Sequence, residues 1–372
     1  MKIYVKLKEK GKKTLKLKKK LTAKEAERLS RNDMPQALWF LSSALRIGEA
    51  VLRVIFSSCL FGICIFLISC STVYGYSEPE DRYTVSALGF DLENRAINVS
   101  ARIVTEDKSE VKVYRGSGES VEYAMSHIKG ADAKQLELSH LAVVVIGDGI
   151  DADTLSNILN YCNGNNDITV GLRLASAHNA SDLLSLKEAD GYTLTGALRD
   201  GKDGSGFTGG SRFYEVENDR LSEHGRTVCH LPYFSVDGEE YFLDGLKLYI
   251  PDGAAVRLDR TESAYYMILR DEFSGGPLDF EYDGEMYSAF VRSSKTHCRY
   301  EDGRADIICE LELNEELLPS GDTEKIMKAC SEEAESLCRD LLSRYGDVME
   351  LEKRLGVIGV SSDEIFVECR KK

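Results

Sequence analysis

The sequence lacks the spacings that mark metal proteins, disulfide frameworks and the common hydrolases and nucleotide-binding enzymes. Its ten cysteines include no C-x-x-C pair and no zinc-ligand spacing. It contains no Walker loop, no H-E-x-x-H and no G-x-S-x-G motif. With no such motif, the sequence predicts no enzyme, no metal and no cofactor.

The cysteines themselves are scattered, and several occupy apolar positions of helix or strand patterns, where a thiol acts as a small hydrophobe. We therefore expect most of them to be reduced core residues with poorly reactive thiols, and one disulfide remains open. They are Cys59, Cys64, Cys70, Cys162, Cys229, Cys298, Cys309, Cys330, Cys338 and Cys369.

Charge is distributed unevenly along the 372 residues. Residues 1–53 hold 15 Lys and Arg against 5 Asp and Glu, a net charge of +10, and subtraction from the total of −15 leaves −25 for residues 54–372. A basic end, an apolar run and an acidic body indicate a chain that is inside, within and outside a membrane in that order. A nucleic-acid-binding arm is the alternative for the basic end, but the apolar run that follows explains the charge more simply.

The apolar run spans residues 54–69, sixteen residues without a charge. A spanning helix needs about 20 residues and a signal-peptide core about 7–15, so length alone does not decide. The run ends in Leu67-Ile68-Ser69-Cys70, which resembles the bacterial lipobox. That resemblance implies a signal peptide that is removed before Cys70, and a Cys70 that carries the lipid.

Two questions about this end of the chain stay open. The run is also compatible with an uncleaved membrane helix that extends to residue 76, with Tyr74 and Tyr76 at the interface. The basic segment 1–53 is longer than an ordinary signal sequence. Either this segment is a real part of the protein on the cytoplasmic side, or translation begins later, at Met34.

Beyond Cys70, the periodicity predicts an α+β protein with antiparallel and mixed sheets and flanking helices. Residues 70–198 are expected to form an N-terminal α/β domain. The pattern there indicates a hairpin over 82–104, a near-continuous apolar and therefore central strand over 141–147, and a helix that begins at Asp151. Further elements are a helix over 119–129, a strand over 168–177 and a short helix over 181–189.

Residues 199–212 are interpreted as a Gly-rich linker, although Gly204-x-Gly206-x-x-Gly209 formally matches a dinucleotide fingerprint. Those glycines matter only between a strand and a helix, and here a strand-like "RFYEV" follows. A middle domain over 213–283 contains strand patterns at 227–236, 240–250 and 253–259. A C-terminal domain over 284–372 contains a long hairpin at 286–313, an amphipathic helix at 322–346 and a final strand.

Isolated residues give weak chemical signals, and each has an ordinary structural explanation. Ser126-x-x-Lys129 matches a Ser/Lys pair but lies on an ordinary amphipathic helix. His140 has no second metal ligand nearby. Asp252, Asp259 and Glu262 are explained by solvated turns around a strand. The hairpin at 286–313 is the expected partner surface, because we predict that it offers an edge strand with unpaired backbone groups.

The order and the local amino-acid sequences of these segments resemble the Ger(x)C family, the C-subunit lipoproteins of spore germinant receptors. "EPEDRYTVSALGFD" is similar to the family's acidic lead-in and first strand, and "SHLAVVVIG" is similar to a later strand. "VCHLPYF", "GAAVRLD" and the hairpin with its following helix also match, so that the resemblance covers roughly residues 67–355. Ser71 departs from the family, which usually has Trp after the lipidated cysteine.

The resemblance implies three α/β domains in series and a lipid anchor at Cys70 on the outer face of the inner spore membrane. It also implies association with two integral membrane subunits, of A and B type, and carries over no catalytic residue. The expected function is therefore a germinant-receptor subunit that works through protein–protein contacts. The alternative is a lipid-anchored solute-binding protein, or a hydrolase with an unrecognised site.

Overall fold

The computed structural model describes residues 48, 51, 53–66, 82–105, 110–128, 135–199, 206, 211–220, 229–250, 255–282, 284–314 and 323–372. The chain forms two compact units, Met1–Ser77 and Glu78–Lys372. In the first unit, residues 53–66 are helical, and large apolar side chains such as Phe56 and Phe61 are exposed. Within the described ranges, no helix combines the length and the apolar composition that a bilayer span requires. The predicted lipobox, residues 67–70, lies outside the described residues.

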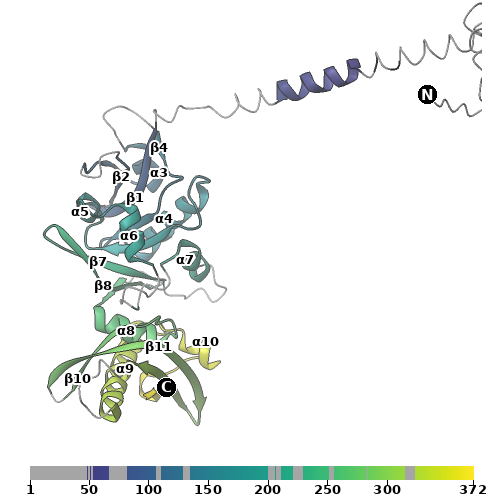
Figure 1. Cartoon of the computed structure of the whole chain (residues 1–372). Coiled ribbons are helices and arrows are strands. Elements are labelled where there is room, and N and C mark those ends of the chain that lie inside the picture. The colour runs from purple at the N-terminus through teal and green to yellow at the C-terminus, as the bar shows by residue number, and fades with distance from the viewer. Residues whose placement is uncertain are drawn as a thin grey trace, which may run out of the picture. The chain divides into compact units, whose positions relative to one another are not determined.

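The second unit contains two sheets, of which the first is large and mixed (Figure 1). Its strand order is β3-β2-β1-β5-β6-β7-β8-β9, and β4 pairs with β1. The central strands β1, β5, β6 and β7 run parallel, whereas the strands on both sides are antiparallel. The strands are β1 (Arg82–Glu93), β2 (Ala96–Ile103), β3 (Val113–Gly118), β4 (Gln135–Glu137), β5 (Val143–Gly147), β6 (Arg173–Ala177), β7 (Cys229–Asp237), β8 (Glu240–Tyr249) and β9 (Ala255–Leu258).

Helices cover both faces of the parallel strands, which explains why all five residues of β5 are buried. Helices α3 (Val121–Ser126), α4 (Ala152–Gly164) and α7 (Phe213–Arg220) contribute buried residues to the core on one face. Helices α5 (Ala180–Ser185) and α6 (Gly191–Ala197) contribute to the core on the other face. The predicted cap is present, because the Asp151 side chain accepts a hydrogen bond from the Thr154 N–H at the start of α4.

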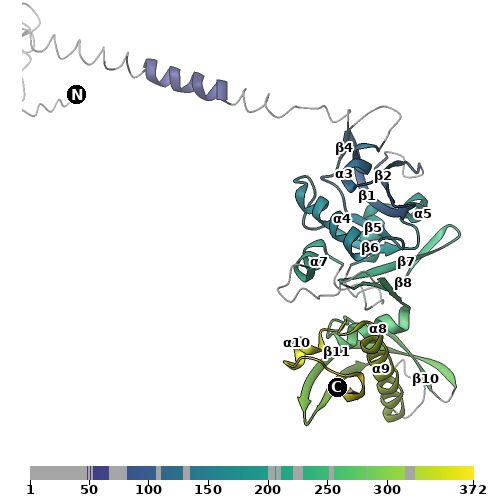
Figure 2. The same ribbon diagram turned by 180° about the vertical axis from the view of Figure 1, so that it is seen from behind.

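The second sheet has the order β10-β11-β12-β13 and packs with three helices (Figures 1 and 2). Its strands are β10 (Gly276–Tyr282), β11 (Glu285–Glu301), β12 (Arg304–Leu313) and β13 (Ile365–Lys371). The helices are α8 (Arg260–Leu269), α9 (Thr323–Tyr345) and α10 (Leu351–Leu355), and the 3-10 turn η3 (Ser362–Glu364) precedes β13. In β12, alternate residues from Ala305 to Leu313 are buried, as the period-two pattern predicts.

The α+β class with mixed sheets is confirmed, and so are the main hairpins and the long helix α9. The strands predicted for the middle domain, 213–283, do not share a sheet of their own, since β7–β9 belong to the first sheet and β10 to the second. Core residues of β8 and β9 also pack with α8 and the second sheet. How the chain divides into domains stays a prediction.

Two sequence-based interpretations are wrong, and a third holds only in part. "RFYEV" is not a strand, because Phe213–Val216 lie in helix α7, where Phe213 and Val216, three residues apart, are buried and Tyr214 is exposed. Asp259 and Glu262 do not lie in a turn but form the capping box that begins α8. In the hairpin of β11 and β12, β13 pairs with β12 and β10 pairs with Glu285–Val291 of β11, whereas residues 293–301 of β11 have only β12 as a strand partner among the described residues.

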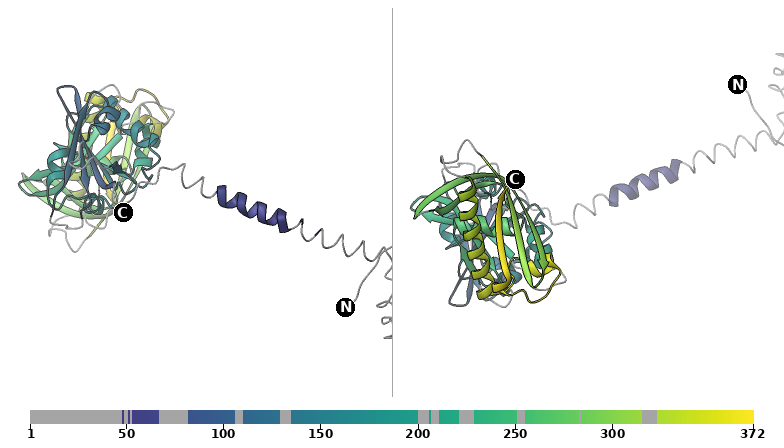
Figure 3. Two further views of the ribbon diagram at one scale, coloured as in Figure 1. Left: turned by 90° about the horizontal axis from the view of Figure 1, so that it is seen from above. Right: turned by 90° about the horizontal axis from the view of Figure 1, so that it is seen from below.

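The outer edge of β13 is covered by side chains of α9, which runs alongside it (Figure 3, right). Ser331 Oγ accepts from the N–H of Cys369 (2.8 Å), and Glu335 Oε2 accepts from the N–H of Val367 (3.1 Å). Arg339 Nη2 donates to the carbonyl oxygen of Ile365 (2.6 Å). Four helix residues rise about 6 Å and two strand residues about 6.6 Å, so the two ladders match in spacing.

We predict that replacing Ser331, Glu335 and Arg339 together with alanine lowers the free energy of unfolding by about 2–4 kcal/mol, from about 0.5–1.5 kcal/mol for each lost hydrogen bond. Denaturant unfolding measures it. The control replaces Lys328 and Glu332, an exposed ion pair on the same helix, with alanine. An equal cost for the two variants would show that α9 does not stabilise the edge of β13.

Candidate functional site

Polar residues gather where the central parallel strands of the first sheet end. Asp91 lies near the end of β1, Asp148 directly follows β5, and His178 directly follows β6. In α/β sheets, ligand sites form outside the carboxyl ends of parallel strands, because the strand ends and the loops after them converge there. This edge is therefore the first place to look for a functional site.

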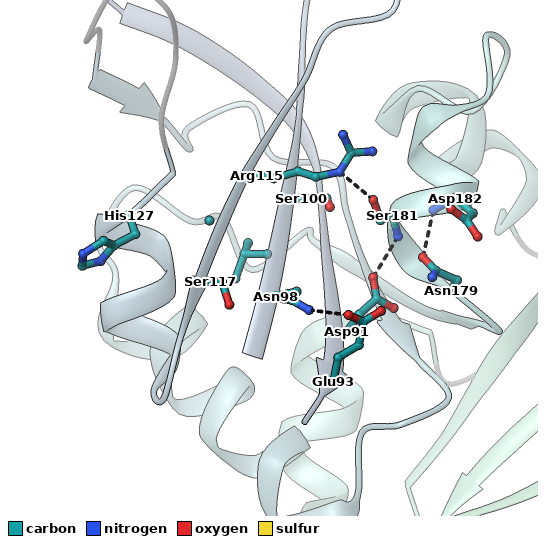
Figure 4. A pocket seen from close by; sticks show the side chains of 12 residues that line it. Asp91, Glu93, Asn98, Ser100, Arg115, Ser117, His127, Asn179, Ser181 and Asp182 are labelled. Carbon is teal, nitrogen blue, oxygen red and sulfur yellow. Dashed lines mark hydrogen bonds between the residues drawn. The ribbon is translucent and has the colours of Figure 1, made fainter. Parts of the chain in front are cut away.

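A pocket of about 510 Å³ lies at this edge beside α5 (Figure 4). Its floor is formed by residues of β1, β2 and β3, and its rim by residues at the start of α5. The lining residues are Asp91, Glu93, Asn98, Val99, Ser100, Arg115, Gly116, Ser117, His127, Asn179, Ser181 and Asp182.

Asp91 is the most buried acid of this pocket, with an exposed fraction of 7%. Its two carboxylate oxygens accept hydrogen bonds from the backbone N–H groups of Ala180 (2.8 Å) and Ser181 (2.9 Å). Burial raises the pKa of the Asp91 carboxyl, although these two hydrogen bonds oppose the shift. Gly147 leaves room for this arrangement, because a Cβ there would lie 2.1 Å from Asp91 Oδ1. Asp91 thus holds the first turn of α5 against the sheet.

Arg115 reaches across the pocket from β3 to α5 (Figure 4). Its Nε donates to Ser181 Oγ (2.9 Å) and its Nη2 to Ser185 Oγ (3.0 Å). On the opposite side, Asn98 Nδ2 donates to Glu93 Oε2 (3.3 Å). The pocket is therefore an open, polar surface of hydrogen-bonding groups, suited to polar contacts and without an arranged nucleophile and base.

We predict that Asp91→Ala lowers the free energy of unfolding by about 1.5–3 kcal/mol, because the N–H groups of Ala180 and Ser181 lose their shared acceptor. Since the folded-state pKa of Asp91 is raised, its contribution is complete below the unfolded pKa, near 4, and is lost as the pH rises through the folded pKa. The cost of Asp91→Ala should therefore be larger at pH 3.5 than at pH 8.

Denaturant unfolding at the two pH values checks this prediction. Asp153→Ala is the control, because Asp153 is an exposed aspartate in the first turn of α4. A cost for Asp91→Ala that rises with pH, or that equals the cost of the control, would contradict this role of the Asp91 carboxylate.

A second polar cluster surrounds Asp148. The Lys247 ammonium, with an exposed fraction of 3%, donates to the carbonyl oxygens of Gly147 (3.3 Å) and Asp148 (3.0 Å) and to Asp148 Oδ1 (3.2 Å). Tyr233 donates to Asp148 Oδ2 (2.9 Å), and His178 Nδ1 lies 2.9 Å from the same oxygen. Burial alone would raise the pKa of Asp148, but these partners outweigh it and lower the pKa. Burial lowers the pKa of Lys247, and Asp148 opposes that shift.

This cluster fastens β5, β6, β7 and β8 to one another at their shared edge. Each polar group in it has a protein partner, so we interpret the cluster as structural. Among the described residues, no three His, Cys, Asp or Glu side chains form a group that would hold a metal ion.

The residues singled out from the sequence are not brought together. Cys70 and the lipobox residues Leu67, Ile68 and Ser69 lie outside the described residues, as do Lys129 and Asp252. Ser126 Oγ donates to the carbonyl oxygen of Tyr123 (2.8 Å), an ordinary bond within α3. His140 is exposed in the turn before β5.

Of the three glycines that match the dinucleotide fingerprint, the structure describes only Gly206, since Gly204 and Gly209 lie outside the described ranges. Gly206 has a φ of 63°, and its carbonyl oxygen accepts from the N–H of Ser274 (3.2 Å). A Cβ there would lie 2.4 Å from the Phe273 ring. This glycine is therefore required for close packing, and no nucleotide motif is needed to explain it.

Sequence reasoning missed Asp91, Asp148 and Lys247. A signal was present for the two acids, since each stands at the end of a buried strand pattern, "SALGFD" and "VVVIGD". Lys247 gave none, because a lysine within "DGLKLYI" is typical of a solvent-facing position.

Residues 75–236 match the family model of the spore germination protein N-terminal domain. The chain therefore contains a spore germination protein N-terminal domain. This match confirms the resemblance to the Ger(x)C family seen in the sequence.

One solved structure, titled "Crystal Structure of the GerBC protein", is similar to this chain, with 11% sequence identity and a TM-score of 0.41. The alignment covers 77% of this chain and 96% of that one. No curated protein matches the sequence.

Proposed function

We propose that the protein is the lipid-anchored C-type subunit of a nutrient germinant receptor and acts through protein–protein contacts rather than by catalysis. The observation that carries the proposal is the position of the family domain. It begins at residue 75, five positions after Cys70, the residue that ends the lipobox-like sequence. A lipid on Cys70 would hold the domain at the membrane surface, beside the integral membrane A- and B-type subunits.

The polar site supports a role in contact rather than in chemistry. Arg115 donates to Ser181 and Ser185, Asp91 accepts from the backbone of α5, and the pocket that they line is open. The body from residue 54 onward carries a net charge of −25, so charged contacts with a partner require basic groups on the partner.

Co-purification from spore membranes tests this proposal. A tagged copy of the protein should bring down two integral membrane proteins in detergent, and calorimetry on residues 71–372 alone should show no tight binding of amino acids or sugars. Tight binding of a small nutrient by residues 71–372, without any other subunit, would favour the solute-binding alternative. Retention of the protein in membranes with no co-purifying integral protein would contradict the receptor assignment.

A further inference from the structure

Two buried cysteines face each other across the last pair of strands. β12 and β13 run parallel, and their register places Cys309 directly beside Cys369. Both thiols are buried, with exposed fractions of 0% and 4%, and they hydrogen-bond to each other. Neighbouring strands lie about 4.8 Å apart, within the Cα separation of about 4.4–6.8 Å that disulfides span. The strand register therefore places the two cysteines at a backbone separation that a disulfide can span.

The remaining cysteines of the second sheet and its helices lie near this pair but are not matched with it in the strand register. Cys330, on α9, hydrogen-bonds to Tyr265, and burial raises the pKa of its thiol to about 12. Burial likewise raises the pKa of Cys338 and of Cys298. None of these three has a cysteine as its partner in the strand register.

Cys309 and Cys369 differ from each other in acidity. The hydrogen bond from Cys369 lowers the pKa of the Cys309 thiol. The same hydrogen bond, together with burial, raises the pKa of Cys369, because its ionisation would place a second charge beside the first.

Access to the buried pair is provided by the position of β13. It is an outer strand of its sheet, paired with β12 on one side and held on the other by three side-chain hydrogen bonds from α9. Outer strands open locally at a lower free energy than the core, so transient opening of β13 exposes both thiols without global unfolding.

We propose that Cys309 and Cys369 are a thiol–disulfide site, which reacts with a small-molecule or protein disulfide and locks the C-terminal strand onto β12. The Cys309 thiolate attacks one sulfur of the oxidant, forms a mixed disulfide and releases the first thiolate. Cys369 then loses its proton to solvent and attacks the Cys309 sulfur, which displaces the second thiolate of the oxidant. Two S–H bonds are lost and one S–S bond forms, while two electrons and two protons convert the oxidant disulfide into two thiols.

The test uses the full chain in detergent. The protein is incubated with oxidised glutathione in urea that is too dilute to unfold it. Free thiols are then alkylated, and peptides are mapped without reductant. We expect a peptide pair linked through Cys309 and Cys369, about 2 Da lighter than the two reduced peptides. Cys298, Cys330 and Cys338 should carry the alkyl group. Amide hydrogen exchange in β13 should slow by about tenfold or more on oxidation and recover with dithiothreitol.

Matched variants give the controls. Cys309→Ala and Cys369→Ala should each abolish the linked peptide, whereas Cys338→Ala, at another buried thiol of the same core, should retain it. A linkage between any other pair would overturn the proposal. So would free Cys309 and Cys369 thiols under conditions in which exchange shows that β13 opens.

Discussion

Replacing Lys247 with methionine is expected to lower the free energy of unfolding by about 3 kcal/mol. Methionine retains the apolar stem but leaves the carbonyl oxygens of Gly147 and Asp148 and one carboxylate oxygen without their shared donor. Removing one member of a buried ion pair costs about 3–5 kcal/mol. We expect the lower end, because the Asp148 side chain is 34% exposed and retains its contacts with Tyr233 and His178.

Denaturant unfolding of the two proteins at pH 7 measures this cost. Lys328→Met is the control, because the Lys328 side chain is 79% exposed and pairs only with Glu332 across one helical turn. It should change stability by less than about 0.5 kcal/mol. Equal costs for the two variants would mean that the contacts of Lys247 do not hold the strand edge together.

The same variant should also change the pH dependence of stability. Because the folded-state pKa of Asp148 is lowered, its contribution is present above the unfolded pKa, near 4, and is lost as the pH falls through the folded pKa. Without Lys247 the pKa of Asp148 shifts upward, so Lys247→Met should lose less stability than the native protein between pH 5 and pH 2. A larger loss of stability between pH 5 and pH 2 in the variant than in the native protein would contradict this prediction.

The second large effect is predicted for Cys70→Ala, which removes the proposed lipid site. Each acyl methylene buried in a membrane contributes about 0.8 kcal/mol, and two chains are needed for stable anchoring. We expect the variant to accumulate as an unprocessed precursor that carries residues 1–69 and no lipid. Detergent phase partition and immunoblotting of the membrane fraction measure the change in size and in lipidation.

Cys64→Ala is the matched control, since Cys64 lies in the same apolar run but outside the lipobox. It should be processed and lipidated as the native chain is. If Cys70→Ala migrates and partitions like the native protein, the run 54–69 is an uncleaved membrane segment and the lipoprotein interpretation is wrong.

The sequence predicted the parts of the fold whose residue pattern has a clear period. Alternation in β12 and the single apolar stripe of α9 depend on local geometry, so they could be recognised without tertiary information. The apolar run "VVVIG" likewise indicated a strand covered on both faces. Asp151 was recognised as a helix cap because its carboxylate acts within one turn.

Features that depend on long-range pairing were missed. The β11–β12 hairpin was expected at a sheet edge, but β13, some 50 residues later in the sequence, pairs with β12, and β10 pairs with the first part of β11. Lys247 contacts residues about 100 positions away, and nothing in its own segment indicates burial. The Asp259 and Glu262 capping box was interpreted as a turn because it directly follows β9, with no intervening loop to indicate a new helix.

The most direct test of the account is the intact mass of the mature protein isolated from spore membranes. The account predicts a chain that begins at Cys70, with a diacylglyceryl group on the thiol and a further acyl chain or a free amine at the new N-terminus. A mass that corresponds to an unlipidated chain beginning at Met1 or Met34 would contradict it.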